Sequence, residues 1–157
     1  MNATTANGQS YVVFPLGDRR FALPTADIVE LSRYGQVQEF PHTSPELEGV
    51  LVRRGRILPV WNLASSLDDC MEVTTKIWLI TKCNFTGDEL TAIPVSGECQ
   101  MFQAQSLLKS SETPGRALGI LMIDDQPIEV LDLRRLRAEN DLQDSDKAQT
   151  EEAGKKS

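Results

Sequence analysis

Residue types that support catalysis or metal binding are sparse in this 157-residue chain. It has one histidine, His42, which follows a proline and has no cysteine or repeated carboxylate beside it. A catalytic or metal site needs several convergent groups, and one imidazole does not supply them. We therefore interpret His42 as a solvated loop residue and expect no catalytic residue and no enzymatic activity.

Two pairs of adjacent aspartates, at 68–69 and 124–125, have the chemistry of Mg²⁺ ligands. Both pairs lie at predicted connections, where aspartate bonds its own backbone and stabilises turns, so the turn interpretation is favoured. The C-terminal residues 154–157 (GKKS) lack the upstream glycine of a phosphate-binding loop, because residue 149 is Gln. We expect neither a metal nor a cofactor.

The charge balance argues against nucleic acid and anionic membrane as partners. The net charge is −7, from 16 basic and 23 acidic side chains, whereas binding to phosphates depends on Lys and Arg. The arginine pairs at 19–20, 53–54 and 134–135 also lack the interleaved aromatic residues of a nucleic-acid surface.

The chain shows no targeting or spanning pattern. The first ten residues have no basic residue and no apolar stretch, and no run approaches the ~20 apolar residues that cross a bilayer. The cysteines, Cys70, Cys83 and Cys99, are odd in number and widely spaced, which is typical of reduced structural thiols. We expect a cytoplasmic protein with no direct membrane insertion, and a monomer when alone.

Residues 49–67 contain the pattern on which the rest of the fold prediction is based. Two apolar runs, 50–52 and 57–60, predict a β-hairpin about Arg54-Gly55, and Asn62 is expected to cap a short helix. The pattern recurs at 119–136, displaced by 70 residues, with Asp132 in the place of Asn62. The sequence therefore predicts one β-rich unit used twice.

Short strands with turn signals between them indicate an all-β barrel or sandwich with a few small helices. Two repeats predict two small barrels, neither stable alone, because ~60 residues build only a marginal core. We expect a disordered tail over 1–10, one domain of two β subdomains over 11–137, and an acidic disordered tail over 138–157. Residues 101–109 are predicted as a short helix or an irregular crossing.

Arg54 stands beside the glycine of the predicted turn. Its planar guanidinium is suited to bridge carbonyls or carboxylates across the junction of two lobes, or to contact a partner. The spacing alone favours neither the structural clasp nor the partner contact.

The ordered motifs F-x-L-G at 14–17, I-V-E-L at 28–31 and G-V-x-x-x-R-G-x-I-x-P-V-x-x-L at 49–63 resemble the CheW-like domain of bacterial chemotaxis coupling proteins. The resemblance implies two five-stranded SH3-like barrels packed face to face. It also implies a non-catalytic adaptor that joins the regulatory domain of a histidine kinase to the cytoplasmic tip of a chemoreceptor.

The resemblance also suggests partner-binding residues. Arg54 matches the family's arginine near the inter-barrel groove, and Gly49 its strand-leading glycine, both linked in the family to receptor coupling. Ile28, Glu30 and Leu31 match a segment that contacts the receptor at its first residue and the kinase at the next. For Ile28 and Leu31, ordinary core packing is the alternative.

The second repeat departs from the family pattern, with Leu-Thr-Ala-Ile-Pro-Val-Ser at 90–96. This departure motivates an alternative function, a divergent CheW-like module that binds only one signalling partner and modulates the pathway.

Overall fold

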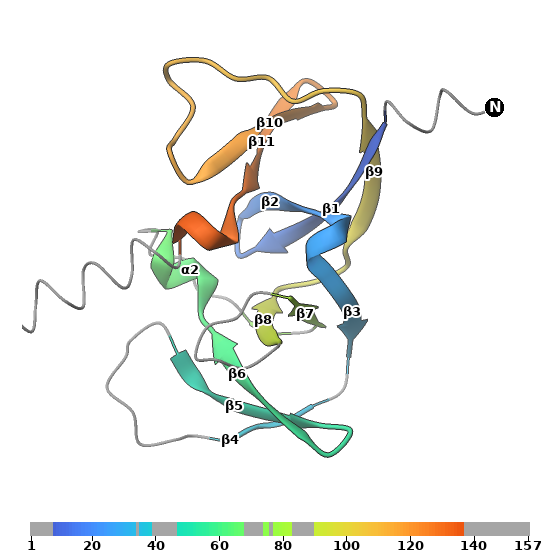
Figure 1. Cartoon of the computed structure of the whole chain (residues 1–157), viewed down its shortest axis with the longest axis vertical. Coiled ribbons are helices and arrows are strands. Elements are labelled where there is room, and N and C mark those ends of the chain that lie inside the picture. Colours follow the sequence, from blue (N-terminus) through green and yellow to red (C-terminus); the bar gives the residue numbers. More distant parts are fainter. Residues whose placement is uncertain are drawn as a thin grey trace, which may run out of the picture.

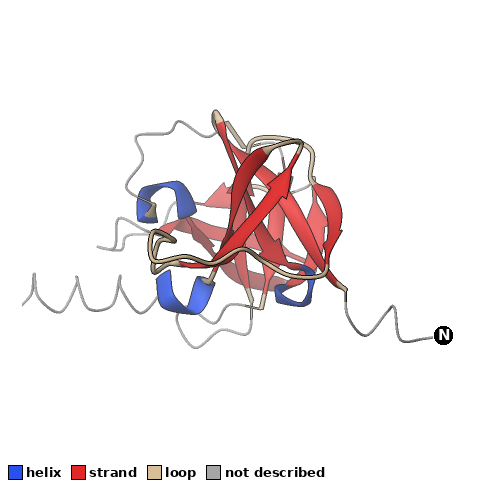
Figure 2. Cartoon of the chain, turned by 90° about the horizontal axis from the view of Figure 1, so that it is seen from above, coloured by secondary structure: helices blue, strands red, loops and turns tan. Residues whose placement is uncertain are grey.

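The computed structural model describes residues 8–33, 35–38, 47–67, 74–75, 77–82 and 90–136. These residues form two curled sheets, one above the other, with short helical turns beside them (Figures 1 and 2). The fold class predicted from the sequence is confirmed, because the protein is all-β and built as two small barrels. One sheet has the five strands that the resemblance implies, whereas the other has six.

Sheet A, the upper one in Figure 1, contains in spatial order β10 (Ala117–Ile123), β11 (Gln126–Leu131), β2 (Arg19–Pro24), β1 (Gln9–Leu16) and β9 (Gln100–Ala104). Sheet B contains β3 (Ile28–Ser32), β7 (Ile77–Thr81), β8 (Thr91–Val95), β6 (Arg56–Trp61), β5 (Leu47–Arg53) and β4 (Val37–Gln38). The helical turns are η1 (Thr25–Asp27), α2 (Leu63–Ser66) and residues 133–136.

Two boundaries differ from the sequence prediction. β1 begins at Gln9, two residues before the expected start of the domain, because it pairs with β9 from Gln9 to Val13. That pairing also makes 100–104 a strand, so the predicted helix or irregular crossing at 101–109 is wrong at its start. Residues 1–7 and the tail 138–157 lie outside the described residues.

The 70-residue repeat is visible in the backbone. β5 pairs with β6 about Arg54-Gly55, and β10 pairs with β11 about residues 124–125. All four turn residues have positive φ, between 50° and 75°, as in the two-residue turns that suit a twisted hairpin. Each ladder shifts register at its leading glycine, Gly49 or Gly119. The predicted duplication is therefore a structural one.

The two repeats exchange strands. β1 and β2 of the first repeat complete sheet A, which otherwise consists of second-repeat strands, while β7 and β8 of the second repeat complete sheet B. Four strand pairings join the repeats: the antiparallel pairs β1–β9 and β3–β7, and two parallel pairs that include Val60 with Ala92 in sheet B and Val130 with Ala22 in sheet A. Each barrel is therefore incomplete without residues from both halves of the chain.

Strand alternation divides the core into three clusters. On β1, Tyr11 and Val13 face the interior of barrel A, while Phe14 and Leu16 face the layer between the sheets. On β7, Trp78 faces the interior of barrel B. The central layer joins both sheets and contains Phe14, Leu16, Phe21, Leu23, Trp61, Leu63, Leu67, Ile77, Leu79, Ile93, Val95, Leu131, Leu133 and Leu136.

Pro94 is accommodated within a central strand. β8 is buried along its whole length, and Pro94 pairs with Trp78 of β7. The parallel ladder with β6 consists of the single pair Val60–Ala92, so Pro94 lies beyond it. Pro94 lacks a backbone N–H, but the pairing of β8 with β6 does not extend to this residue.

The two matched helix starts are capped differently. Asp132 Oδ1 accepts hydrogen bonds from the backbone N–H groups of Arg134 (3.1 Å) and Arg135 (3.4 Å). Asn62 precedes α2 as predicted, but its side chain makes no capping hydrogen bond, so the predicted capping role is wrong. α2 is instead held by burial of Leu63 and Ala64.

This difference predicts unequal costs for two alanine substitutions. Asp132→Ala should lower the free energy of unfolding by about 1 kcal/mol, because two N–H groups lose their acceptor. Asn62→Ala should change it by less than ~0.5 kcal/mol. Urea unfolding followed by circular dichroism measures both, and an equal loss in the two variants would contradict the assignment.

Candidate protein-binding surface

Glu30 and Arg54, two of the predicted site residues, lie together at the open side of barrel B. The Glu30 carboxylate of β3 is ion-paired with Arg53 and with Arg54, whose Nη2 lies 3.3 Å from Oε1. Arg53 Nε also donates to the Oγ of the buried Ser32, at 3.3 Å. Because β3 is an outer strand of sheet B, these contacts join it to the β5–β6 turn and close the barrel through side chains.

Arg53 and Arg54 differ in their exposure and in their contacts. The Arg53 side chain is 17% exposed and bonds both Glu30 and Ser32, whereas the Arg54 side chain is 75% exposed. Arg53 is therefore the clasp, and most of the Arg54 guanidinium faces solvent. The clasp lies within one barrel, so of the two alternatives for Arg54 the bridge across two lobes is wrong: its partner Glu30 is in the same sheet.

Ile28 and Leu31, two more of the predicted residues, both belong to β3 but differ in burial. Ile28 packs against the central core layer, as the core alternative proposed, while Leu31 is 46% exposed. Val29, which the sequence reasoning missed, is also exposed, at 49%. The alternation of side chains along a strand could have identified Val29, because it places Val29 and Leu31 on the face opposite Glu30.

A second exposed apolar pair flanks the turn that carries Arg54. Val52 and Ile57 are paired across β5 and β6 and are 45% and 62% exposed. Sequence reasoning treated both as ordinary strand residues, although hairpin register places them together on the face opposite the buried Leu51 and Leu58. Exposed apolar residues near charged ones are typical of protein-binding surfaces.

Gly49 has a structural role in this geometry. Its φ is 155°, and a Cβ there would lie 2.4 Å from the carbonyl oxygen of Gln38 in β4. It is buried at the register shift of β5. Gly49 therefore permits β4 to pack against β5 and presents no side chain to a partner.

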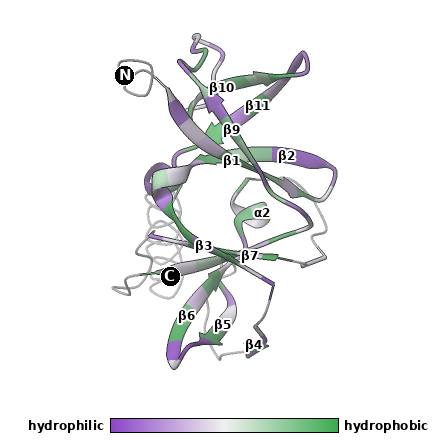
Figure 3. Ribbon diagram, turned by 90° about the vertical axis from the view of Figure 1, so that its right-hand side faces the viewer, coloured by the Kyte–Doolittle hydropathy of each residue, from purple (hydrophilic) through white to green (hydrophobic). Residues whose placement is uncertain are grey.

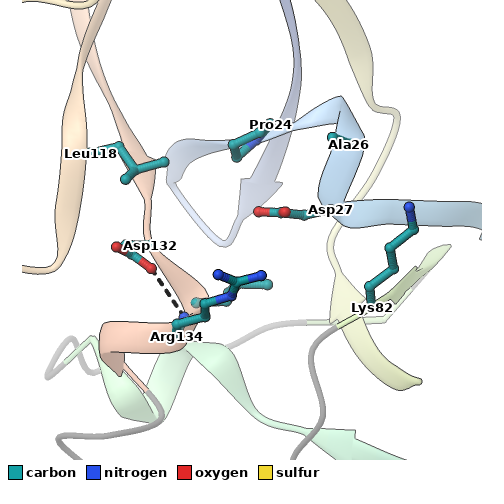
Figure 4. Close-up of a pocket in the computed structure, with 8 residues that line it drawn as sticks. Pro24, Ala26, Asp27, Lys82, Leu118, Asp132 and Arg134 are labelled. Atoms are coloured by element: carbon teal, nitrogen blue, oxygen red, sulfur yellow. Dashed lines mark hydrogen bonds between the residues drawn. The ribbon is translucent and has the colours of Figure 1, made fainter. Parts of the chain in front are cut away.

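A groove of about 490 Å³ lies between the two barrels, away from the clasp (Figure 4). Its charged lining residues are Asp27, Lys82, Asp132 and Arg134, and the Asp27 carboxylate and the Arg134 guanidinium face into the same hollow. Burial raises the pKa of Asp27, and the nearby Arg134 offsets part of that rise. Ile28 directly follows Asp27 along the chain, but it is not among the residues that line the groove.

The described residues offer little reactive chemistry. They contain no group of three or more His, Cys, Asp or Glu side chains arranged to hold a metal ion. Cys99 is half-buried, and burial raises the pKa of its thiol to about 11. His42, the aspartates at 68–69, Cys70 and Cys83 lie outside the described residues. No helix in the described part of the chain is long and apolar enough to span a membrane.

The family model for the CheW-like domain matches residues 10–73, which include β2 to β6, α2 and all of β1 except Gln9. This segment is CheW-like. The predicted resemblance is thereby confirmed, and the matched segment carries both the clasp and the exposed pairs of barrel B.

Two known proteins are similar to this chain. The fold of this chain matches the scaffolding protein TtCheW from Thermoanaerobacter tengcongensis with a TM-score of 0.67, over 82% of this chain and 91% of that one. The identity is 22%, so this likeness concerns the fold alone. Protein FrzA of Myxococcus xanthus is 34% identical over 55 residues, which span 35% of this chain and 34% of FrzA.

Alanine substitutions of Arg53 and of Arg54 should distinguish the arginine that stabilises barrel B from the one that mostly faces solvent. Arg53→Ala should lower the free energy of unfolding by about 1–3 kcal/mol, because Ser32 and the partly buried Glu30 lose hydrogen-bond partners. Arg54→Ala should change it by less than ~0.5 kcal/mol, because the side chain is mostly solvated. Urea titration measures both; the reverse order would exclude Arg53 as the clasp.

Gly49→Ala should destabilise the protein by about 1–3 kcal/mol, because the new methyl group collides with the Gln38 carbonyl and φ is unfavourable. Gly115→Ala is the control, since a Cβ there meets nothing within 4 Å. Thermal unfolding of both variants measures the difference. Equal stability of the two variants would show that the packing of β4 against β5 does not require glycine at position 49.

Proposed function

We propose that this protein is a non-enzymatic adaptor that couples the cytoplasmic tip of a chemoreceptor to the regulatory domain of a histidine kinase. The setting is cytoplasmic signalling for chemotaxis or pilus motility. The observation that carries the proposal is the CheW-like match over residues 10–73, on the same segment that exposes charged and apolar side chains at the edge of barrel B.

The architecture supports an adaptor in place of an enzyme. The interior of each barrel is filled by aliphatic and aromatic side chains, which leaves the chemistry-bearing residues at strand edges and turns. Binding through such rigid strand edges needs no rearrangement of the core. We propose Arg54, Leu31 and Glu30 as partner-contacting residues, with Glu30 also orienting the arginines.

Ile28 and Gly49 are proposed to act indirectly. Ile28 fixes the position of β3 through its core contact, and Gly49 fixes β5 beneath β4. Substitutions at either residue would weaken coupling by displacing the surface and not by removing a contact.

Binding of the full chain to two purified partners tests the proposal. The partners are the kinase regulatory domain and the chemoreceptor cytoplasmic fragment encoded in the same genome, measured by surface plasmon resonance separately and together. Wild type should form both binary complexes and the ternary complex. Arg54→Ala and Leu31→Ser should each weaken at least one complex by about tenfold, or ~1.4 kcal/mol.

Arg20→Ala is the matched control, because Arg20 is also an exposed arginine near a hairpin turn but lies in β2 of barrel A, where it donates to Gln126 at 3.3 Å. It should bind as wild type does. One retained binary complex without a ternary complex would favour the alternative, a module that engages a single partner. Loss of both binary complexes in the wild type would overturn the proposal.

A further inference from the structure

Two exposed methionines of barrel A stand where barrel B has aliphatic residues. Met101 of β9 is 68% exposed and Met122 of β10 is 46% exposed. Displaced by 70 residues, they correspond to Leu31 of β3 and Val52 of β5, which are 46% and 45% exposed. Figure 3 shows sheet A, with β9 and β10, above sheet B, with β3 and β5. The two barrels therefore expose apolar side chains at matching positions, and those of barrel A contain sulfur.

Neither methionine belongs to the core of barrel A. Strand alternation places Met122 beside Leu121, which is 2% exposed, and Met101 beside Phe102, which packs against the barrel A core. Each methionine side chain therefore lies on the face opposite its inward neighbour. A polar oxygen added at either sulfur is hydrated, and it leaves no buried group without a hydrogen-bond partner. Oxidation at these two positions is therefore compatible with the folded protein.

Cys99, the cysteine that the structure describes, is poorly suited to react with peroxide. Its thiol is half-buried and donates to the carbonyl oxygen of Gly97 at 3.8 Å. Burial, with a smaller contribution from the Glu98 carboxylate, raises the pKa of this thiol to about 11. Because the thiolate is the reactive form, Cys99 reacts slowly at neutral pH, whereas a methionine thioether needs no deprotonation. Among the described sulfurs, the two exposed thioethers are therefore the accessible targets.

We propose that Met101 and Met122 are sites of reversible oxidation to methionine sulfoxide by hydrogen peroxide. A sulfur lone pair attacks one peroxide oxygen, so that an S–O bond forms as the O–O bond breaks, and the second oxygen leaves as water after proton transfer. The sulfur loses two electrons and the peroxide gains them. The product is a polar side chain in place of a flexible apolar one.

The modification distinguishes the two barrels. Leu31 and Val52 contain no sulfur, so peroxide makes the exposed surface of barrel A polar and leaves the matching surface of barrel B apolar. A dithiol-dependent reductase reverses the change, because two thiols become a disulfide while the sulfoxide oxygen leaves as water and the thioether is restored. Each epimer of the sulfoxide needs its own reductase. This inference goes beyond the proposed function, and its test uses no receptor or kinase.

Peptide mass spectrometry of the folded full chain, treated with hydrogen peroxide at neutral pH, tests the inference. Both methionines should form sulfoxide at rates within about tenfold of that of N-acetylmethionine amide, because both are exposed. Cys99 should remain a thiol over the same period, and urea unfolding of the oxidised protein should match that of the untreated protein. Incubation with reductases for both epimers should return both methionines to the thioether.

The matched control is the double variant Met101→Leu with Met122→Leu, which keeps both positions apolar and lacks their sulfurs. Met1 and Met71, which lie outside the described residues, are the same in wild type and variant. On a hydrophobic-interaction column, peroxide should shorten the retention of wild type more than that of the variant. The reductases should restore the retention of wild type.

Three kinds of result would overturn the inference. Oxidation of either methionine more than about tenfold slower than the reference compound would show that the fold protects that sulfur. Loss of the folded state on oxidation, or sulfoxide that the reductases leave unreduced, would show that the change is damage and not a reversible modification. An equal fall in retention for wild type and variant would show that these two positions do not determine the surface change.

Discussion

The structure depends on the reciprocal exchange of β-hairpins between the two repeats. Each barrel is closed by a hairpin from the other half of the chain, through the parallel pairs Val60–Ala92 and Val130–Ala22. The exchanged strands β2 and β8 bury one face inside a barrel and the other in the central layer. The strand exchange thereby adds core to each repeat, which by its size alone is expected to build only a marginal one.

This constraint separates the interior from the surface. The barrel interiors and the central layer together require apolar residues on both faces of the exchanged strands, which leaves little room there for functional polar groups. The outer strand β3 and the hairpin turns are free of that demand, and they carry the Glu30 cluster and the exposed apolar pairs. Sequence divergence between the repeats, such as arginine at 54 and aspartate at 124, is tolerated there because only the backbone of the turn is shared.

Local patterns predicted much of the fold. The hairpin about Arg54-Gly55 follows from glycine and alternation, which act within a few residues, and the repeat interval follows from spacing. The short helix after Asn62 was also predicted, although not by the capping contact that motivated it. The strand exchange was not predictable in this way, because it depends on pairings between residues more than 30 positions apart, such as Val60 and Ala92.

The candidate surface was predicted only in part, because some of its contacts also depend on residues that are far apart in the sequence. Glu30 and Arg54 were identified by family resemblance, and the structure brings them together. Arg53 and Val29 were missed because their roles depend on which strand lies opposite and which face points outward. Gly49 was identified, but its structural role required the position of the Gln38 carbonyl.

The central claim is that the exchanged hairpins make both barrels one cooperative unit. Native-state hydrogen exchange of the full chain tests it most directly, by comparing the opening free energies of amides in β2 and β11 with those in β6 and β8. The account predicts that the most protected amides of both sheets share one global opening free energy. Exchange of one sheet through an opening that leaves the other fully protected would contradict it.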